Sequence, residues 1–268
     1  MNLDFHAVST LIFDLDGVIW RGEAPVPGAS DSVASLRASG VRCLFATNNS
    51  SRPPLFYAQK LGAMGIDAAP DAIVTSSSAT ALHLSKHLPP GFSAYVVGEA
   101  GIALALQSIG AVLVDENAEK ADCVVAGIDR DFHYSKLRAA QKFLLGGAQF
   151  IATNRDATFP VEGGVLPGAG SIVAAIATAS GTEPLSMGKP EPAMLLTILE
   201  DYGLTPTQAA MIGDRLDTDI ACANRAGIGA IFVATGVTPM ELARQAKGEM
   251  RPDAFFEDLP ALVAALNL

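Results

Sequence analysis

The chain has 268 residues, half of them hydrophobic, which is enough for one or two domains with a sizeable core. Its formal charge of -10 argues against a nucleic-acid partner, because binding a phosphate backbone requires a clustered basic surface. Three widely separated cysteines in apolar surroundings indicate reduced thiols in a cytoplasmic protein. The first apolar run contains two aspartates, so we expect neither a signal peptide nor a membrane span.

The first predicted strand ends in two carboxylates. Residues 11–13 form a short apolar run typical of a buried strand, and Asp14 follows at its carboxyl end, where ligands bind in an open parallel sheet. Asp16 lies two residues further on, so both carboxylates can face one site, and Gly17 permits a turn. The alternative is a polar strand end that leads into a loop, because Asp and Gly both favour turns.

A polar cluster follows the second predicted strand, at 41–46. It consists of Thr47, Asn48, Asn49, Ser50 and Ser51. A helix is expected to begin at the two prolines 53 and 54 and to run through Leu61. Backbone N–H groups at such a helix start form an anion site. One of the two serines is expected to be an N-cap, which is compatible with a binding role for Thr47 and Asn48.

The middle of the chain resembles a separate folding unit. A third strand is predicted at 72–75, and Ser76–Ser78 marks a boundary, after which the strand pattern starts afresh. The later strand-like segments are 95–98, 112–114, 123–128 and 150–153, with helical stretches such as 136–145 between them. We therefore predict an inserted α/β domain at 79–184 within a larger domain formed by 1–78 and 185–268.

Three polar residues follow the last strand of the inserted domain: Asn154, Arg155 and Asp156. Loops at strand ends often carry specificity, so these residues are candidates for recognising a substrate. A turn is expected a few residues later, at Gly163 and Gly164.

The last part of the chain supplies a lysine and a second strand that ends in acid. Lys189 lies between Gly188 and Pro190, which constrain the backbone on both sides, and a helix is expected to begin at residue 190 or 191. A lone lysine is more commonly a solvated charge. The apolar run at 209–212 predicts a buried strand, and Asp214 and Asp219 follow it. Two predicted strands are thus followed by aspartates, which we expect at the same edge of the sheet.

In this order, Asp14-Leu15-Asp16-Gly17, Thr47-Asn48, Lys189 and Gly213-Asp214 with Asp219 resemble the four motifs of the haloacid dehalogenase-like (HAD) phosphohydrolases. The inserted block resembles the large cap of the subgroup typified by NagD, p-nitrophenyl phosphatases and phosphoglycolate phosphatases. The resemblance covers essentially the whole chain. It implies an α/β fold: a Rossmann-like core with a parallel sheet and helices on both faces, plus an inserted α/β cap.

The resemblance also implies a Mg²⁺-dependent phosphatase that works through an aspartyl-phosphate. Asp14 would be the nucleophile and Asp16 the general acid and then base, with Lys189 neutralising charge. Mg²⁺ would be held by the side chains of Asp14 and Asp214 and the backbone carbonyl of Asp16. Asp219 would orient Lys189 or a metal-bound water. The residues expected to contact the substrate are Gly17, Thr47, Asn48 and Asn49, with Asn154, Arg155 and Asp156 at its leaving group.

The residues leave several alternatives open. A phosphotransferase, or a catalytically weak ligand-binding protein with the same fold, would carry much of the same pattern. The expected partner is a small phosphate monoester, with neither nucleic acid nor membrane. The identity of that ester is open, and so is the oligomeric state, although relatives of the resembled subgroup dimerise through the cap.

Overall fold

A computed structural model describes residues 4–161 and 164–266 of the chain, which form two compact units. The core unit comprises the chain up to Thr47, the segment Leu55–Val74 and the chain from Lys189 onward. The cap unit comprises Asn48–Pro54 and Thr75–Gly188, and the predicted insertion at 79–184 lies within it. The predicted turn at Gly163 and Gly164 falls partly outside the described residues.

The short segment Asn48–Pro54 was not expected in the cap unit. It belongs there because its backbone carbonyls find hydrogen-bond donors in that unit. The Ser76 hydroxyl donates to the Asn48 carbonyl at 2.6 Å, and the Gly101 amide donates to the Ser51 carbonyl at 3.1 Å.

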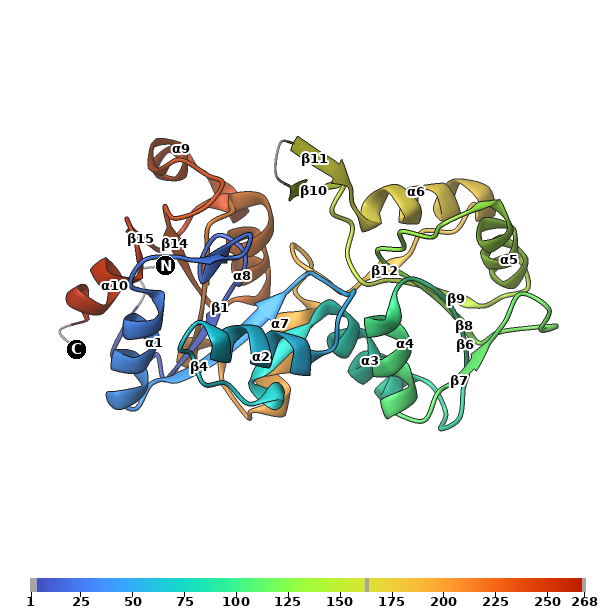
Figure 1. Cartoon of the computed structure of the whole chain (residues 1–268), viewed down its shortest axis with the longest axis horizontal. Coiled ribbons are helices and arrows are strands. Elements are labelled where there is room, and N and C mark those ends of the chain that lie inside the picture. Colours follow the sequence, from blue (N-terminus) through green and yellow to red (C-terminus); the bar gives the residue numbers. More distant parts are fainter. Residues whose placement is uncertain (1–3, 162–163, 267–268) are drawn as a thin grey trace. The chain divides into compact units, whose positions relative to one another are not determined.

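The core unit is built on a six-stranded sheet in the order β15-β14-β13-β1-β4-β5 (Figure 1). The strands are β1 (Thr10–Phe13), β4 (Arg42–Thr47), β5 (Ile73–Thr75), β13 (Ala209–Gly213), β14 (Gly229–Val233) and β15 (Ala254–Phe256). β1 pairs in parallel with both β4 and β13. Because the chain leaves β1 toward β4 and later returns on the other side at β13, a topological switch point lies beside β1, where ligands bind in such sheets.

Both faces of β1 are buried, as its uninterrupted apolar sequence requires. Leu11 and Phe13 pack in one cluster with residues of three helices, whereas Ile12, which alternates to the other face, is also fully buried. The helices of the core unit are α1 (Ala29–Ala38), α2 (Pro54–Ala63), α7 (Ala193–Asp201), α8 (Ala221–Ala226), α9 (Met240–Gln245) and α10 (Leu259–Ala265). The predicted α/β core with helices on both faces of a parallel sheet is confirmed.

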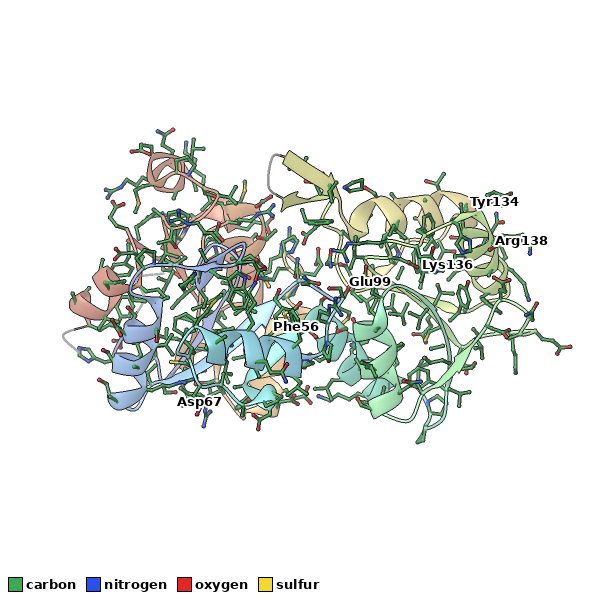
Figure 2. The ribbon with its side chains drawn as sticks, in the orientation of Figure 1. Phe56, Asp67, Glu99, Tyr134, Lys136 and Arg138 are labelled. Carbon is green, nitrogen blue, oxygen red and sulfur yellow. The ribbon has the colours of Figure 1, made fainter. Side chains whose placement is uncertain are left out.

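The cap unit has its own parallel sheet, in the order β12-β9-β8-β6-β7. Its strands are β6 (Ser93–Val97), β7 (Val112–Val114), β8 (Cys123–Ala126), β9 (Gln149–Ala152) and β12 (Leu185–Ser186). The helices are α3 (Ser76–His87), α4 (Ala100–Ser108), α5 (Tyr134–Leu145) and α6 (Ala169–Ser180). Helix α5 packs Phe143 into a second hydrophobic cluster, while Tyr134 and Arg138 are exposed on its outer side (Figure 2).

Two local features of the structure refine the sequence predictions. Ser76–Ser78 forms the first turn of α3, directly after the unit boundary between Val74 and Thr75, because the Thr75 side chain caps the Ser78 amide and the Ser78 side chain caps Thr75 in return. Helix α7 begins at Ala193, later than expected, since a residue before proline disfavours the helical conformation and Glu191 precedes Pro192.

Two short hairpins were also missed. They pair β2 (Trp20–Arg21) with β3 (Ala24–Pro25), and β10 (Thr158–Val161) with β11 (Gly164–Pro167). Within the described residues, no helix combines the length and the apolar character needed to cross a bilayer.

The hydrophobic cluster of the cap unit can be tested on α5. Phe143 is 2% exposed and Leu145, on the same helix, is 69% exposed. Phe143→Ala should lower the free energy of unfolding by about 3–5 kcal/mol, because it removes buried surface and leaves a cavity. Leu145→Ala should change it by less than about 0.5 kcal/mol. Urea unfolding followed by circular dichroism measures both, and equal effects would contradict the assigned packing.

Candidate active site

The polar residues of the core unit gather where its parallel strands end. Asp14 directly follows β1, Thr47 is the last residue of β4, and Asp214 directly follows β13. All three are buried, with Asp214 having no exposed surface. The Asp14 amide continues the sheet ladder by donating to the Ile212 carbonyl at 2.9 Å. Adjacent parallel strands with aligned register therefore bring Asp14 and Asp214 to the same edge.

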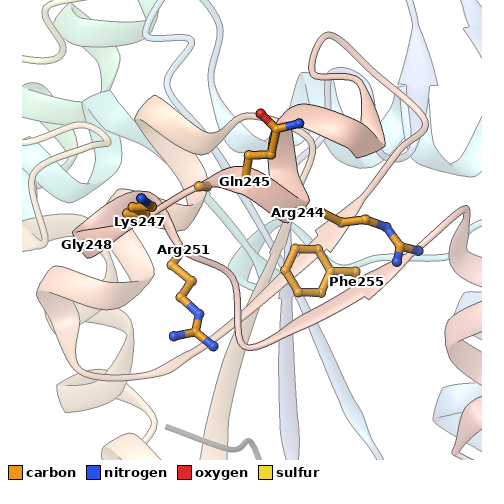
Figure 3. Close-up of a pocket in the computed structure, with 7 residues that line it drawn as sticks. Arg244, Gln245, Lys247, Gly248, Arg251 and Phe255 are labelled. Atoms are coloured by element: carbon orange, nitrogen blue, oxygen red, sulfur yellow. The ribbon is translucent and has the colours of Figure 1, made fainter.

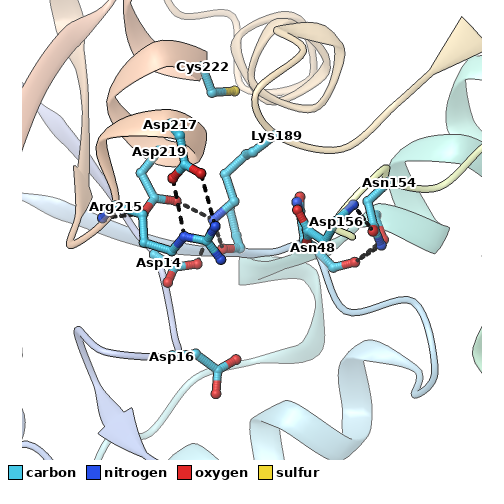
Figure 4. A network of polar contacts seen from close by, with 12 residues as sticks. Asp14, Asp16, Asn48, Asn154, Asp156, Lys189, Arg215, Asp217, Asp219 and Cys222 are labelled. Carbon is cyan, nitrogen blue, oxygen red and sulfur yellow. Dashed lines mark hydrogen bonds and ion pairs between the residues drawn. The ribbon is translucent and has the colours of Figure 1, made fainter. Parts of the chain in front are cut away.

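Lys189 lies in the middle of this edge with its ammonium group buried (Figure 4). Nζ donates to Asp14 Oδ1 at 2.5 Å, to Asp219 Oδ1 at 2.7 Å and to the Ala46 carbonyl at 3.3 Å. These three acceptors match the three donors of an ammonium group. A buried lysine that meets two carboxylates is a fixed positive charge, so the alternative of a solvated surface lysine is excluded.

Asp219 is the second carboxylate that holds this lysine. It lies in a single turn of π-helix, η3 (Leu216–Ile220), and is 1% exposed. Its Oδ1 accepts from Lys189, and its Oδ2 accepts from the Arg215 backbone amide at 3.1 Å. Since both oxygens are already used, the geometry suits a residue that orients Lys189.

Asp214 has one oxygen satisfied and one without a partner. The Val237 amide donates to Oδ2 at 2.6 Å, whereas Oδ1 is buried with no hydrogen-bond partner among the described residues. One carboxylate oxygen each from Asp14, Asp214 and Asp219 lies within 4.8 Å of the others. Oxygen donors at this spacing, one of them orphaned, fit a hard divalent cation such as Mg²⁺.

The charges in this cluster affect one another. Burial raises the pKa of Asp214 to about 7, and the neighbouring Asp219 carboxylate adds to the effect, while the Val237 amide and Lys189 oppose it. Burial likewise raises the pKa of Asp14 well above its usual value, against the pull of Lys189. Three carboxyl groups thus share one ammonium group in a buried site, and a bound cation would favour their ionised forms.

Residues after β14 complete the edge, and the sequence analysis did not find them. Thr235 donates its hydroxyl to the Gly17 carbonyl at 2.7 Å. A Cβ on Gly236 would lie 1.9 Å from Asp214 Oδ2, and one on Gly17, whose φ is +88°, would lie 2.6 Å from Asp214 Cγ. Both glycines are thus required by the close approach of Asp214. In the sequence, the polar pair Thr235 and Gly236 directly after a buried apolar strand could have indicated that this loop belongs to the site.

Asp16 stands apart from the buried cluster. Its side chain is exposed, and Oδ1 accepts a hydrogen bond from the Trp20 indole at 2.9 Å. The Gly17 amide donates to the Trp20 carbonyl, which closes the turn that carries Asp16.

The remaining predicted site residues belong to the cap unit, where Asn48, Asn154 and Asp156 form one network (Figure 4). Asn48 Nδ2 donates to Asp156 Oδ2 at 3.0 Å, and Asn154 Nδ2 donates to the Asn48 carbonyl at 2.8 Å. Asn49 Oδ1 accepts from the Ser51 amide. Arg155 is exposed and pairs with Glu183 at 3.3 Å. The network binds the segment after β4 to the loop after β9, a link across 108 residues of sequence.

A cavity of about 680 Å³ lies elsewhere in the core unit, beside α9 (Figure 3). It is lined by Arg244, Gln245, Ala246, Lys247, Gly248, Arg251 and Phe255, none of which belongs to the carboxylate cluster.

Comparison with known proteins assigns the family. Residues 11–112 match the model of the haloacid dehalogenase-like hydrolases, and residues 186–262 match a second, HAD-hydrolase-like model. An acid sugar phosphatase from Staphylococcus aureus is 38% identical over 256 residues, which cover 96% of this chain and 97% of the relative. The chain belongs to the haloacid dehalogenase-like hydrolases. This confirms the family that the sequence motifs predicted.

Solved structures of HAD-like phosphatases share the fold over nearly the whole chain. A 4-nitrophenylphosphatase from Thermotoga maritima has a TM-score of 0.90 at 35% identity, covering 97% of this chain and 98% of its own. A glycerol phosphate phosphatase from Mycobacterium tuberculosis, solved in complex with magnesium, has a TM-score of 0.87 at 36% identity, covering 96% of this chain and 76% of its own. These neighbours place the chain in the NagD-like subgroup.

The elevated pKa of Asp214 predicts how magnesium and pH act together on stability. The folded protein without metal binds more protons than the unfolded chain between about pH 4 and 7, so the contribution of protonated Asp214 to stability is lost as the pH rises through 7. Mg²⁺ requires ionised carboxylates. We expect Mg²⁺ to raise the melting temperature more at pH 8 than at pH 5.5.

Thermal unfolding with and without Mg²⁺ at the two pH values measures this effect. Asp214→Asn should remove most of the rise, whereas the nearby and largely exposed Asp217 can be changed to Asn as a control that preserves it. A magnesium effect of equal size at both pH values would contradict the prediction.

Proposed function

We propose that this protein is a Mg²⁺-dependent phosphoric monoester hydrolase that acts on small phosphorylated metabolites. The observation that carries the proposal is the buried Lys189 between two carboxylates, beside the orphaned oxygen of Asp214. Family membership and relatives named as acid sugar, glycerol phosphate and nitrophenyl phosphatases support it. A hydrolase of this class forms an aspartyl-phosphate and then hydrolyses it.

In this proposal Asp14 is the nucleophile. A carboxylate that approaches a phosphate at ~4 Å is repelled by roughly 4 kcal/mol per charge pair at an effective dielectric of 20. Lys189 opposes this repulsion because its ammonium group contacts Asp14 directly. Asp14 and Asp214, with the backbone carbonyl of Asp16, would hold Mg²⁺, which when bound neutralises phosphate charge and orients the phosphoryl group.

Asp16 is proposed to act as the general acid and then the general base. Asp16 is exposed, in contrast to the buried Asp14, and desolvation of its carboxyl group raises the pKa, which suits proton transfer to a leaving group. It gives a proton to the leaving alkoxide and later takes one from the attacking water. A residue able to activate water favours hydrolysis over phosphoryl transfer to another acceptor.

We also propose which residues contact the substrate. In the core unit, Gly17 and Thr47 are the residues proposed to contact the substrate phosphate. In the cap unit, Asn48 and Asn49 are proposed to contact the substrate. Asn154 and Asp156 have their side chains engaged with Asn48, which favours a role in placing that residue. Arg155, exposed on the same loop, keeps its proposed role at the leaving group.

The relatives' printed names suggest sugar phosphates and glycerol phosphate as the first esters to test. We also propose a cytoplasmic location, which the three buried free thiols support because they fit a reducing compartment. A homodimer formed through the cap is also proposed, and analytical ultracentrifugation would test it.

The activity itself is tested by phosphate release from a panel of metabolite esters with Mg²⁺. We expect EDTA to abolish release and excess Mg²⁺ to restore it, because the carboxylates cannot approach phosphate uncompensated. Measuring ester loss and free phosphate together distinguishes hydrolysis from transfer. Undiminished activity after removal of all divalent ions would contradict the metal requirement.

Asp14→Asn should lower kcat by ~10³-fold or more, because the amide cannot form the phosphoenzyme. Circular dichroism should show an unchanged fold. Asp217→Asn, which changes an exposed carboxylate, serves as the matched control and should retain activity. Substantial turnover by the Asp14 variant would remove this residue from the nucleophile role.

A further inference from the structure

The chain contains a single tryptophan, and its one polar atom is bound to the proposed acid-base residue. Trp20 is 2% exposed, yet its Nε1 donates to Oδ1 of the exposed Asp16 at 2.9 Å. No other hydrogen bond to the Asp16 carboxylate is present in the described part of the chain. A buried indole thus fixes the side chain of an exposed residue.

The backbone around this contact is held independently of it. The Leu15 carbonyl accepts from the amides of Ile19 at 2.9 Å and Trp20 at 3.1 Å, and the Gly17 amide donates to the Trp20 carbonyl at 2.7 Å. The turn therefore does not need the indole hydrogen bond to form. What the hydrogen bond adds is the orientation of the Asp16 carboxylate.

Trp20 is itself restrained by the neighbouring helix. Lys60, on α2, places Nζ 4.6 Å from the centroid of the Trp20 ring and donates to the Gly22 carbonyl at 2.9 Å. A cation over an indole face is a favourable contact. Because Lys60 also bonds to Glu23, it ties the β2–β3 hairpin and the ring to one helix. The Trp20 Nε1–H group that donates to Asp16 is therefore held in a fixed position.

We propose that Trp20 is a positioning residue for the acid-base chemistry of Asp16. This inference rests on the proposed phosphatase function. With Oδ1 held by the indole, Oδ2 is the oxygen that exchanges the proton. In the first step the bond from Asp14 to phosphorus forms, the ester P–O bond breaks and the Asp16 proton passes to the leaving oxygen. In the second step, a water molecule gives a proton to Asp16. The oxygen of that water forms a bond to phosphorus, and the bond from Asp14 to phosphorus breaks.

The consequence depends on the leaving group. An alkoxide, as from glycerol phosphate, is a poor leaving group and needs the proton from Asp16, whereas p-nitrophenolate leaves readily without it. Loss of correct positioning should therefore lower kcat/KM for alkyl esters and spare p-nitrophenyl phosphate. A purely structural role of Trp20 would affect both substrates alike, because kcat/KM includes the same binding and the same nucleophile.

The sharpest variant exploits the single tryptophan. Expression with 3-(benzothiophen-3-yl)alanine in place of tryptophan replaces one N–H by sulfur at this position alone and preserves the ring shape. Trp20→Phe is the genetically simpler second variant, and Asp16→Asn is the reference for complete loss of acid catalysis. Thermal unfolding of each protein establishes that it is folded.

We expect both Trp20 replacements to lower kcat/KM for glycerol phosphate by roughly 10–100-fold, within the range of general acid catalysis, and that for p-nitrophenyl phosphate by less than about threefold. Asp16→Asn should also lower kcat/KM more for glycerol phosphate than for p-nitrophenyl phosphate, and by a larger factor than the Trp20 replacements. Equal losses on both esters, or no loss on either, would overturn the positioning role. If the unsubstituted protein releases phosphate neither from these two esters nor from any other ester of the metabolite panel, the proposed function fails instead.

Discussion

The contact of the Lys189 ammonium group with two aspartates organises the active site. A buried charge is costly unless it is paired and fully hydrogen-bonded, and Nζ meets that condition with Asp14, Asp219 and a backbone carbonyl. Removing Lys189 would leave both aspartates buried without their cation. In the proposed mechanism, Lys189 both pairs with these two buried aspartates and lowers the barrier to attack by Asp14 on an anion.

Asp214, the third carboxylate of the cluster, is unfavourable for stability and suited to binding a ligand. Asp214 adds a negative charge that the lysine does not balance, and one of its oxygens has no described partner. The surrounding loops hold it in place nonetheless, through the Val237 amide and two glycines that leave room for it. An unfavourable charge maintained in this way is the signature of a site built for a ligand, here a divalent cation.

The two aspartates of the first motif have different environments, which suits different roles. Asp14 is buried among charges, whereas Asp16 is exposed and held by a neutral donor on a restrained ring. In the proposed mechanism, this difference in environment suits Asp14 to attack phosphorus and Asp16 to exchange protons. The hairpin that carries Trp20, short as it is, belongs to the catalytic apparatus in this view.

The sequence by itself determined the strands that end in acid, the constrained lysine and the order of the motifs, because buried strands and tight turns are encoded by neighbouring residues. Only the tertiary structure decided which partners meet. Gly236 looks like any turn glycine until it is seen beside Asp214, and the bond from Asn48 to Asp156 spans 108 residues. The Trp20 indole likewise reads as a core residue until its donor is located. Local patterns fix backbone conformation, whereas contacts between distant segments depend on how the sheets and loops pack, and no window of sequence contains that information.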